Sequence, residues 1–259
     1  METVTSNDGT TIAYDRLGSG PPVALVCGGS VDRQANAGYA QLLAAHFTVF
    51  NFDRRGRGDS GDTPPYTIDR EIEDIAAVIE AAGDSAGLWG SSSGGALALL
   101  ATASGLPVSK LAVWEPPYFV DDRFTPPPAD TASTYRRLVS EGRRGEAVEF
   151  FMGEVVGMPP EFVAWARTQP FWEGQERIAH TLAYDAEIMG DYSLPADRIA
   201  AIAVPTLVLT GGSSMPFMAP AAEAIVNLIP GARHVVLEGQ DHNVAPEVLV
   251  PALRDFFGG

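Results

Sequence analysis

The sequence predicts an α/β fold whose centre is a mostly parallel, eight-stranded sheet with helices on both faces. Apolar runs of strand length alternate along the chain with amphipathic helical stretches, which is typical of a parallel sheet covered on both sides. The start of the chain differs, because Thr11–Tyr14 alternates in polarity directly after the turn signal Asp8-Gly9. We therefore expect an antiparallel hairpin to open the sheet.

Six buried strands are expected after the hairpin, at Val23–Cys27, Thr48–Phe52, Ala86–Trp89, Leu111–Trp114, Thr206–Leu209 and His234–Leu237. A helix is expected between the second and third of these strands. Apolar side chains recur there at helical spacing and a glycine supplies the stop, at Ile72, Ile75, Ala76, Ile79 and Gly83. Two late helices, Ala221–Ile229 and Glu247–Phe257, are expected to pack on the same sheet.

The stretch from 118 to 195 has a different character. It opens with the proline run Pro126–Pro128, is rich in aromatic residues and contains helical pieces without an intervening strand. We interpret it as a helical cap inserted after the sixth strand. Residues 1–117 and 196–259 would then form the core of the fold.

Composition limits the partners of the protein. The 259 residues include 17 basic and 33 acidic side chains, for a net charge of −16. Such a polyanion repels phosphate backbones and anionic lipid surfaces, so neither nucleic acid nor membrane is expected as a partner. Cys27 is the only cysteine, the first residues lack a signal-peptide pattern, and no apolar run is long enough to cross a bilayer. We expect a soluble, cytoplasmic monomer or homodimer.

No cofactor or metal is expected. The four histidines are scattered, and the carboxylates show no ligand spacing. The glycine pair after the first core strand, in Gly28-Gly29-Ser30, lacks the G-x-G-x-x-G spacing of a dinucleotide site.

The strongest chemical signal directly follows the strand Ala86–Trp89 and precedes a helix of small residues. It is the nucleophile-elbow pattern G-x-S-x-G, in Gly90-Ser91-Ser92-Ser93-Gly94. The central serine must adopt a strained backbone to expose its hydroxyl, and side chains at the flanking positions would clash. The helix that follows directs free N–H groups toward developing negative charge. The pattern predicts Ser92 as a nucleophile.

The segment Asp53–Ser60 resembles the D-x-R-G-x-G-x-S loop common in α/β-hydrolases. With the elbow, this resemblance to the α/β-hydrolase family covers essentially the whole chain and implies the α/β-hydrolase fold. It also implies that His242, on the loop after the strand His234–Leu237, is the general base that takes the serine proton. The other histidines are weaker candidates: His46, His180 and His234.

The acid departs from the usual family pattern. In most members it follows the penultimate strand, but the segment Thr210–Pro216 holds no carboxylate, and Ser214 stands where an aspartate is expected. Either the enzyme uses a dyad or the acid comes from elsewhere. Glu115, directly after the strand Leu111–Trp114, occupies the alternative acid position known within the fold and keeps the order Ser92, Glu115, His242. Asp241, adjacent to His242, is badly placed to reach the distal ring nitrogen.

An oxyanion hole is expected from backbone N–H groups. One donor would be Ser93, directly after the nucleophile. The other would come from the loop after the first core strand, at either Gly29 or Ser30.

Within the serine members, the Ser-Ser-Gly ending of the elbow, the Glu115-Pro116 strand end and a cap tryptophan resemble the zearalenone-type lactonases. That resemblance implies that Trp172 overhangs the serine. Apolar side chains of the cap and of the loop after Leu209 are candidates to line the pocket: Trp165, Phe171, Trp172, Tyr184, Met189, Phe217 and Met218. Such a pocket suits a hydrophobic ester or lactone.

The leading hypothesis is a cofactor-independent serine hydrolase that cleaves a hydrophobic carboxylic ester or lactone through an acyl-enzyme. A second hypothesis is an acyltransferase or a cyclising thioesterase, which would need a dry cap that excludes water. A third is a non-catalytic ligand-binding receptor that has kept the hydrolase fold, since fold alone does not settle function.

Overall fold

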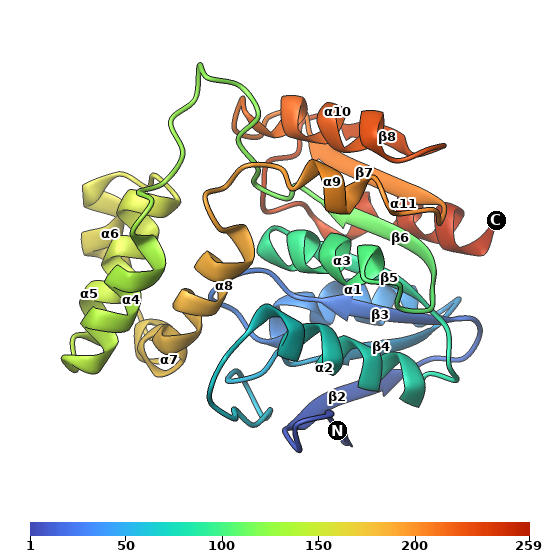
Figure 1. Ribbon diagram of the computed structural model, residues 1–259, viewed down its shortest axis with the longest axis horizontal. Helices are drawn as coiled ribbons and strands as arrows, with labels where there is room; N and C mark the ends of the chain where they lie inside the picture. The colour runs from blue at the N-terminus through green and yellow to red at the C-terminus, as the bar shows by residue number, and fades with distance from the viewer.

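The computed structural model describes residues 1–259 and contains one sheet with the strand order β1-β2-β4-β3-β5-β6-β7-β8 (Figure 1). The strands are β1 (Glu2–Thr5), β2 (Thr11–Leu17), β3 (Pro22–Val26), β4 (Thr48–Phe52), β5 (Ala86–Ser91), β6 (Val108–Trp114), β7 (Thr206–Gly211) and β8 (Arg233–Leu237). Only β2 pairs antiparallel, with β1 and with β4, and all other neighbours are parallel. The predicted eight-stranded, mostly parallel sheet is confirmed.

The helices that cover the sheet follow the expected pattern of crossovers. They are α1 (Ala37–Leu43), α2 (Ile68–Ala81), α3 (Ser93–Ala103), α10 (Met218–Leu228) and α11 (Pro246–Gly258), with a short 3-10 helix at Arg33–Asn36. The start of α2 illustrates the local cause: the Thr67 side chain accepts a hydrogen bond from the Arg70 N–H, which satisfies a free donor of the first turn. None of the helices has the length and apolar character needed to cross a membrane.

The sheet separates two hydrophobic layers. Helices α2, α3 and α10 pack on one face, in a cluster that includes Ala24 and Val26 of β3. Helices α1 and α11 pack on the other face, in a cluster that includes Val23 and Leu25 of the same strand. Successive side chains of a strand point to opposite faces, so one apolar run supplies both layers.

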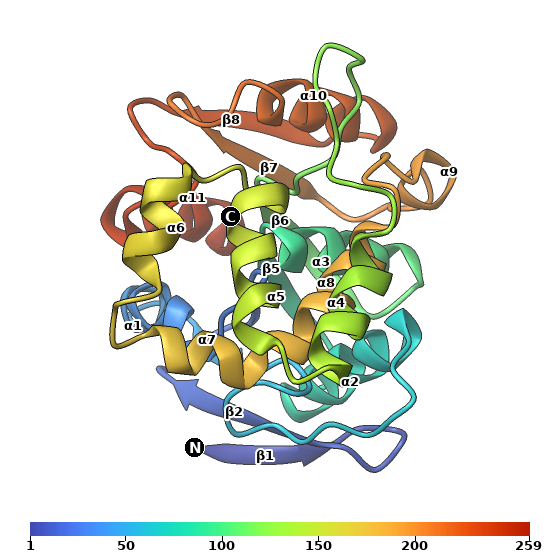
Figure 2. The ribbon, with the colours of Figure 1, turned by 90° about the vertical axis from the view of Figure 1, so that its left-hand side faces the viewer.

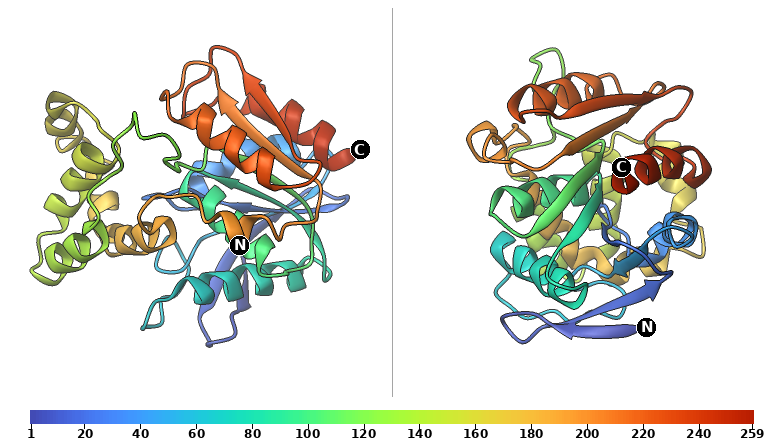
Figure 3. Two further views of the ribbon diagram at one scale, coloured as in Figure 1. Left: turned by 45° about the horizontal axis from the view of Figure 1, so that its top comes forward. Right: turned by 90° about the vertical axis from the view of Figure 1, so that its right-hand side faces the viewer.

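A helical insert, defined here as residues 115–205 between β6 and β7, holds no strand. Its helices are α4 (Thr131–Ser140), α5 (Arg144–Phe150), a π-helical turn (Phe151–Val155), α6 (Pro160–Ala166), α7 (Trp172–Ile178), a 3-10 turn (Ala179–Thr181), α8 (Leu182–Met189) and α9 (Ala196–Ile199). Helices α4 to α7 stand beside the sheet, while α8 lies between them and α3 (Figures 1 and 2). The C-terminus lies on the opposite side of the core (Figure 3).

The two ends of the insert pack differently. Its first helices enclose a small hydrophobic core of their own, which contains Tyr135 and Trp172. Its last part belongs to the main core, where Ile188, Met189 and Ile199 are buried against the α3 side of the sheet. The insert is therefore anchored to the sheet through α8 and α9.

We predict that Ile75→Ala lowers the free energy of unfolding by about 2–5 kcal/mol, because the Ile75 side chain is fully buried between α2 and the sheet and its removal leaves a cavity. Urea denaturation monitored by circular dichroism measures this loss. Glu80→Ala is the control on the same helix, since Glu80 is exposed and should change stability by less than about 0.5 kcal/mol. Equal losses for the two variants would contradict the burial of Ile75 between α2 and the sheet.

Candidate active site

Ser92 sits in the sharp turn between β5 and α3, with φ 56° and ψ −127°. Its N–H donates to the Trp114 carbonyl oxygen at 2.8 Å, which ties the turn to the end of β6. A Cβ atom added to Gly90 would overlap the Gly94 carbonyl group, and one added to Gly94 would overlap the carbonyl oxygen of Cys27. The two glycines of the G-x-S-x-G pattern are thus required by close backbone approach.

Glu115 and His242 are in direct contact. Glu115 Oε2 lies 2.7 Å from His242 Nδ1, and Glu115 Oε1 accepts the Gly211 N–H at 2.7 Å. The carboxylate is buried, with 1% of the residue exposed, while His242 is partly exposed. The Trp114 indole N–H donates to the His242 carbonyl oxygen at 3.0 Å. Both oxygens of the carboxylate are used, so the imidazole has a fixed partner on Nδ1.

Trp114 connects the Ser92 turn to the Glu115–His242 pair. Its carbonyl oxygen accepts the Ser92 N–H, and its indole N–H donates to the His242 carbonyl oxygen. No hydrogen bond joins Ser92 and His242 in this structure. Catalytic hydrogen bonds are often long or poorly aligned without substrate and tighten in the Michaelis complex.

Backbone strain gathers at this edge of the sheet. Five non-glycine residues have positive φ, and three of them are Ser30, Ser92 and Glu115. Such conformations cost about 1–3 kcal/mol each and persist where the surrounding structure holds them, often at functional sites. The strain therefore points independently to the region that the sequence motifs indicated.

The loop Gly28–Ser30 lies next to the elbow. A Cβ atom added to Gly28 would be 3.2 Å from Ser92 Cβ. Ser93 is the first residue of α3, so its N–H has no acceptor within the helix. Ser30 Oγ donates to Gln175 Oε1 of α7 at 2.5 Å. The residues expected to form an oxyanion hole are therefore neighbours, and one of them, Ser30, is bound by Gln175 of the insert.

Ser214, at the usual acid position, has a buried hydroxyl without a hydrogen-bond partner. The other histidines are occupied elsewhere or exposed. His234 Nε2 lies 2.8 Å from Thr210 Oγ1, and burial lowers the pKa of His234. His180 lies near Asp62, and His46 is exposed. Only His242 among the four contacts a buried carboxylate at this edge.

The structure scatters the side chains expected to line the pocket. Trp172 is buried in the insert's own core and donates to Glu176 at 2.8 Å, which differs from the expectation that it overhangs the serine. Met189 is in the main core and Met218 is buried at the start of α10. The face of a helix on which a side chain lies decides whether it packs into the main core, into the core of the insert or toward a pocket. Position in the sequence alone does not tell these three apart.

The remaining expected lining residues are more accessible. Trp165 and Phe171 are neighbours on the insert with 52% and 45% of each residue exposed. Phe217 stacks on Phe119 with ring centroids 4.2 Å apart. Tyr184 instead stacks on Tyr66 and donates to Asp62.

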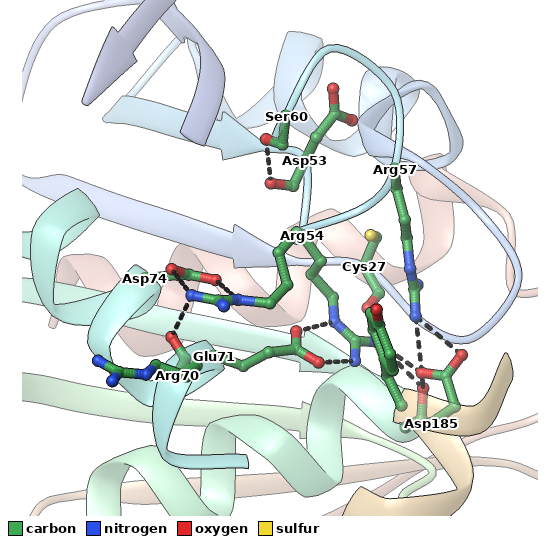
Figure 4. A network of polar contacts seen from close by, with 12 residues as sticks. Cys27, Asp53, Arg54, Arg57, Ser60, Arg70, Glu71, Asp74 and Asp185 are labelled. Atoms are coloured by element: carbon green, nitrogen blue, oxygen red, sulfur yellow. Dashed lines mark hydrogen bonds and ion pairs between the residues drawn. The ribbon is translucent and has the colours of Figure 1, made fainter. Parts of the chain in front are cut away.

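A buried ion-pair network next to the elbow was not expected from the sequence. Asp185 of α8 binds the guanidinium groups of Arg54 and Arg57, which follow β4 (Figure 4). Burial alone would raise the pKa of Asp185, but Arg57 and Arg54 outweigh that effect and lower the pKa to about 2. A partial signal was present: Asp185 and Glu187 interrupt the apolar residues of α8, and the Asp53–Ser60 loop carries extra arginines at its variable positions.

Comparisons with known sequences and structures identify the family of this chain. A family model described as "Alpha/beta hydrolase family" matches residues 23–252. The chain belongs to the alpha/beta hydrolase family. Family membership supports a hydrolase, and the fold expected from the resemblance is confirmed.

Similar proteins match this chain over nearly its whole length. An alpha/beta hydrolase from Sphaerobacter thermophilus is 54% identical, with a TM-score of 0.94 over 99% of this chain and 100% of that chain. A non-heme haloperoxidase from Rhodococcus erythropolis is 27% identical over 94% of this chain and 93% of that protein. An enol-lactonase from Burkholderia xenovorans is 20% identical with a TM-score of 0.73, covering 100% of both chains, and shows the fold alone.

We predict that Gly94→Ala lowers the free energy of unfolding by about 1–3 kcal/mol, because the new methyl group would overlap the Cys27 carbonyl oxygen and push α3 away from β3. Gly153→Ala is the matched control: the same substitution in open space, at a residue without positive φ. Urea denaturation compares the two variants. Wild-type stability of Gly94→Ala would contradict the close approach of Gly94 to the Cys27 carbonyl oxygen.

Proposed function

We propose that this alpha/beta hydrolase cleaves a hydrophobic carboxylic ester or lactone through an acyl-enzyme, with Ser92 as nucleophile, His242 as general base and Glu115 as the acid of the triad. The 2.7 Å contact between Glu115 and His242 Nδ1, beside the strained Ser92 turn, is the observation that carries this proposal. A serine nucleophile needs a base that is itself oriented by a third group.

In the proposed mechanism, Ser92 Oγ attacks the carbonyl carbon while His242 Nε2 takes the hydroxyl proton. The carbonyl oxygen becomes an oxyanion, which the N–H groups of Ser93 and of Gly29 or Ser30 would stabilise. The intermediate collapses, the C–O bond to the alcohol breaks, and His242 returns its proton to that oxygen. Water, deprotonated by His242, then attacks the acyl-enzyme and releases the carboxylic acid with Ser92 regenerated.

The environment of Glu115 suits the role of the acid. Its Oε1 is held by the Gly211 N–H, so Oε2 faces His242 in one geometry. A proton on Nδ1 directed at this carboxylate leaves Nε2 as the acceptor for the serine proton. The buried negative charge also stabilises the imidazolium that forms during attack.

The ester or lactone class is supported by two further observations. Aromatic side chains remain accessible on the insert, at Trp165 and Phe171, and would favour an apolar substrate. Among the proteins of the same fold are an esterase from Thermogutta terrifontis, 24% identical, and the Burkholderia enol-lactonase. Both names denote transfer of an acyl group to water.

We predict that a fluorophosphonate probe labels the wild-type protein at one residue, Ser92, and that Ser92→Ala abolishes labelling. Ser92 is partly exposed in the elbow turn, and the neighbouring N–H groups favour the anionic adduct. Mass spectrometry of the labelled peptide identifies the site. Ser91→Ala is the control beside it and should keep the label. Absence of labelling in the folded wild type would favour a ligand-binding protein instead of an enzyme.

We predict that Glu115→Gln lowers kcat on a chromogenic short-chain ester by roughly 100-fold or more, because the amide no longer holds the imidazole in the correct tautomer. Ser214→Ala is the matched control at the usual acid position. It should retain near wild-type activity, since the Ser214 hydroxyl binds nothing. Circular dichroism checks that both variants fold.

Full activity of Glu115→Gln would contradict the triad and leave a dyad of Ser92 and His242. Loss of activity in Ser214→Ala but not in Glu115→Gln would place the orienting group on the loop after β7.

A further inference from the structure

Asp185 reaches from α8 of the insert to the two segments that carry the proposed oxyanion donors. Its Oδ1 accepts the Ser93 hydroxyl at 2.9 Å. A Cβ atom added to Gly29 would lie 3.2 Å from Asp185 Oδ2 and 3.4 Å from Ser93 Oγ. One buried carboxylate therefore touches both the start of α3 and the loop Gly28–Ser30.

Arg57 links this carboxylate to the backbone of the loop. Its Nη2 donates to both oxygens of Asp185, at 2.9 and 2.8 Å. Its Nη1 donates to the carbonyl oxygen of Gly28 at 2.6 Å and to that of Val31 at 3.2 Å. The Gly28 carbonyl and the Gly29 N–H belong to one planar trans peptide and point in opposite directions. Holding the Gly28 oxygen on Arg57 thus directs the Gly29 N–H away from the arginine.

Arg54 completes the network. Its Nη1 donates to Asp185 Oδ1 at 2.8 Å, and its Nε and Nη2 donate to the two oxygens of Glu71, at 2.7 and 2.8 Å (Figure 4). Two guanidinium groups face two carboxylates, all buried, so the charges balance. Paired, charge-assisted hydrogen bonds of this kind have narrow geometry and resist displacement.

Attachment of the insert does not by itself require this network. Helix α8 is already anchored by apolar side chains, since Ile188 and Met189 are buried in the main core. Buried ion pairs add little stability compared with well-packed apolar side chains of similar volume. The network instead specifies the positions of the groups it binds, and those groups are the Gly28–Val31 backbone and Ser93.

We infer, on the basis of the proposed function, that Asp185 is a positioning residue that holds the oxyanion-binding loop and Ser93 in register with Ser92 through Arg57 and Arg54. Because Asp185 belongs to the insert, the geometry of the oxyanion hole depends on a helix outside the sheet. Its loss acts on the transition state, where the oxyanion exists, and not on binding of the neutral ester.

The test compares Asp185→Asn with Asp74→Asn. Asp74 is the matched control, because it is also a buried carboxylate paired with an arginine of the same loop, Arg55, but it contacts neither the Gly28–Ser30 loop nor Ser93. Asp185→Asn is expected to lower kcat on a short-chain ester by about 10- to 100-fold with KM within about threefold of wild type. Asp74→Asn is expected to keep kcat even if it lowers the melting temperature.

A transition-state analogue gives an independent readout. The affinity of a trifluoromethyl ketone, whose adduct with Ser92 carries an oxyanion, should fall in Asp185→Asn by the same factor as kcat/KM. The affinity of the corresponding methyl ketone should not change. Should Asp185→Asn fail to fold, Arg57→Lys replaces it, since lysine keeps the charge but cannot bind Asp185 and the Gly28 carbonyl as a fork. It should show the same selective loss.

Crystal structures of the variants separate this inference from the proposed function. Displacement of Gly28–Val31 in Asp185→Asn but not in Asp74→Asn supports the positioning role, even if the wild type neither hydrolyses esters nor takes the fluorophosphonate label. An unmoved loop with wild-type kcat in Asp185→Asn overturns it. Equal falls in kcat for Asp185→Asn and Asp74→Asn also overturn it, because they would reduce the network to a general scaffold.

Discussion

The close approach of α3 to the end of β3 is the constraint on which the rest of the candidate site depends. Gly94 lies against the Cys27 carbonyl with no room for a side chain. This contact sets the sharp turn at Ser92, starts α3 at Ser93 and brings both beside Gly28–Ser30. Nucleophile, helix N-terminus and loop amides therefore share one location because three backbone segments pack without intervening side chains.

Two buried carboxylates flank this backbone arrangement and are neutralised in different ways. Glu115 has one backbone N–H and one imidazole as partners. No arginine or lysine pairs with it, so its negative charge can act on the His242 ring. Asp185 is bound by two guanidinium groups and a hydroxyl, which leaves it charged and fixed. The partners of Glu115 suit the acid of a catalytic triad, whereas those of Asp185 suit a residue that fixes its neighbours in place. Both are buried acids in a strongly acidic protein.

Much of the fold could be predicted because its signals are local. Strand β4 begins and ends as expected at Thr48 and Phe52, and the hairpin, the crossovers and the insert after β6 follow from polarity and turn residues. The site was partly predictable for the same reason, since Ser92 lies in a contiguous motif. Trp172 shows the limit: a tryptophan in a cap can face either the substrate or its own helices, and here it packs on the helices.

Local sequence was enough to predict the succession of strands and helices along the chain, the strained serine turn and the lack of a carboxylate at the usual acid position, because each depends on neighbouring residues. The contacts between distant groups became visible only in the folded chain. Glu115 and His242 are 127 residues apart, and Arg57 and Asp185 are 128 apart. The carboxyl ends of parallel strands converge on one edge of the sheet, which brings Glu115 to His242, and the packing of α8 on that edge brings Asp185 to Arg57.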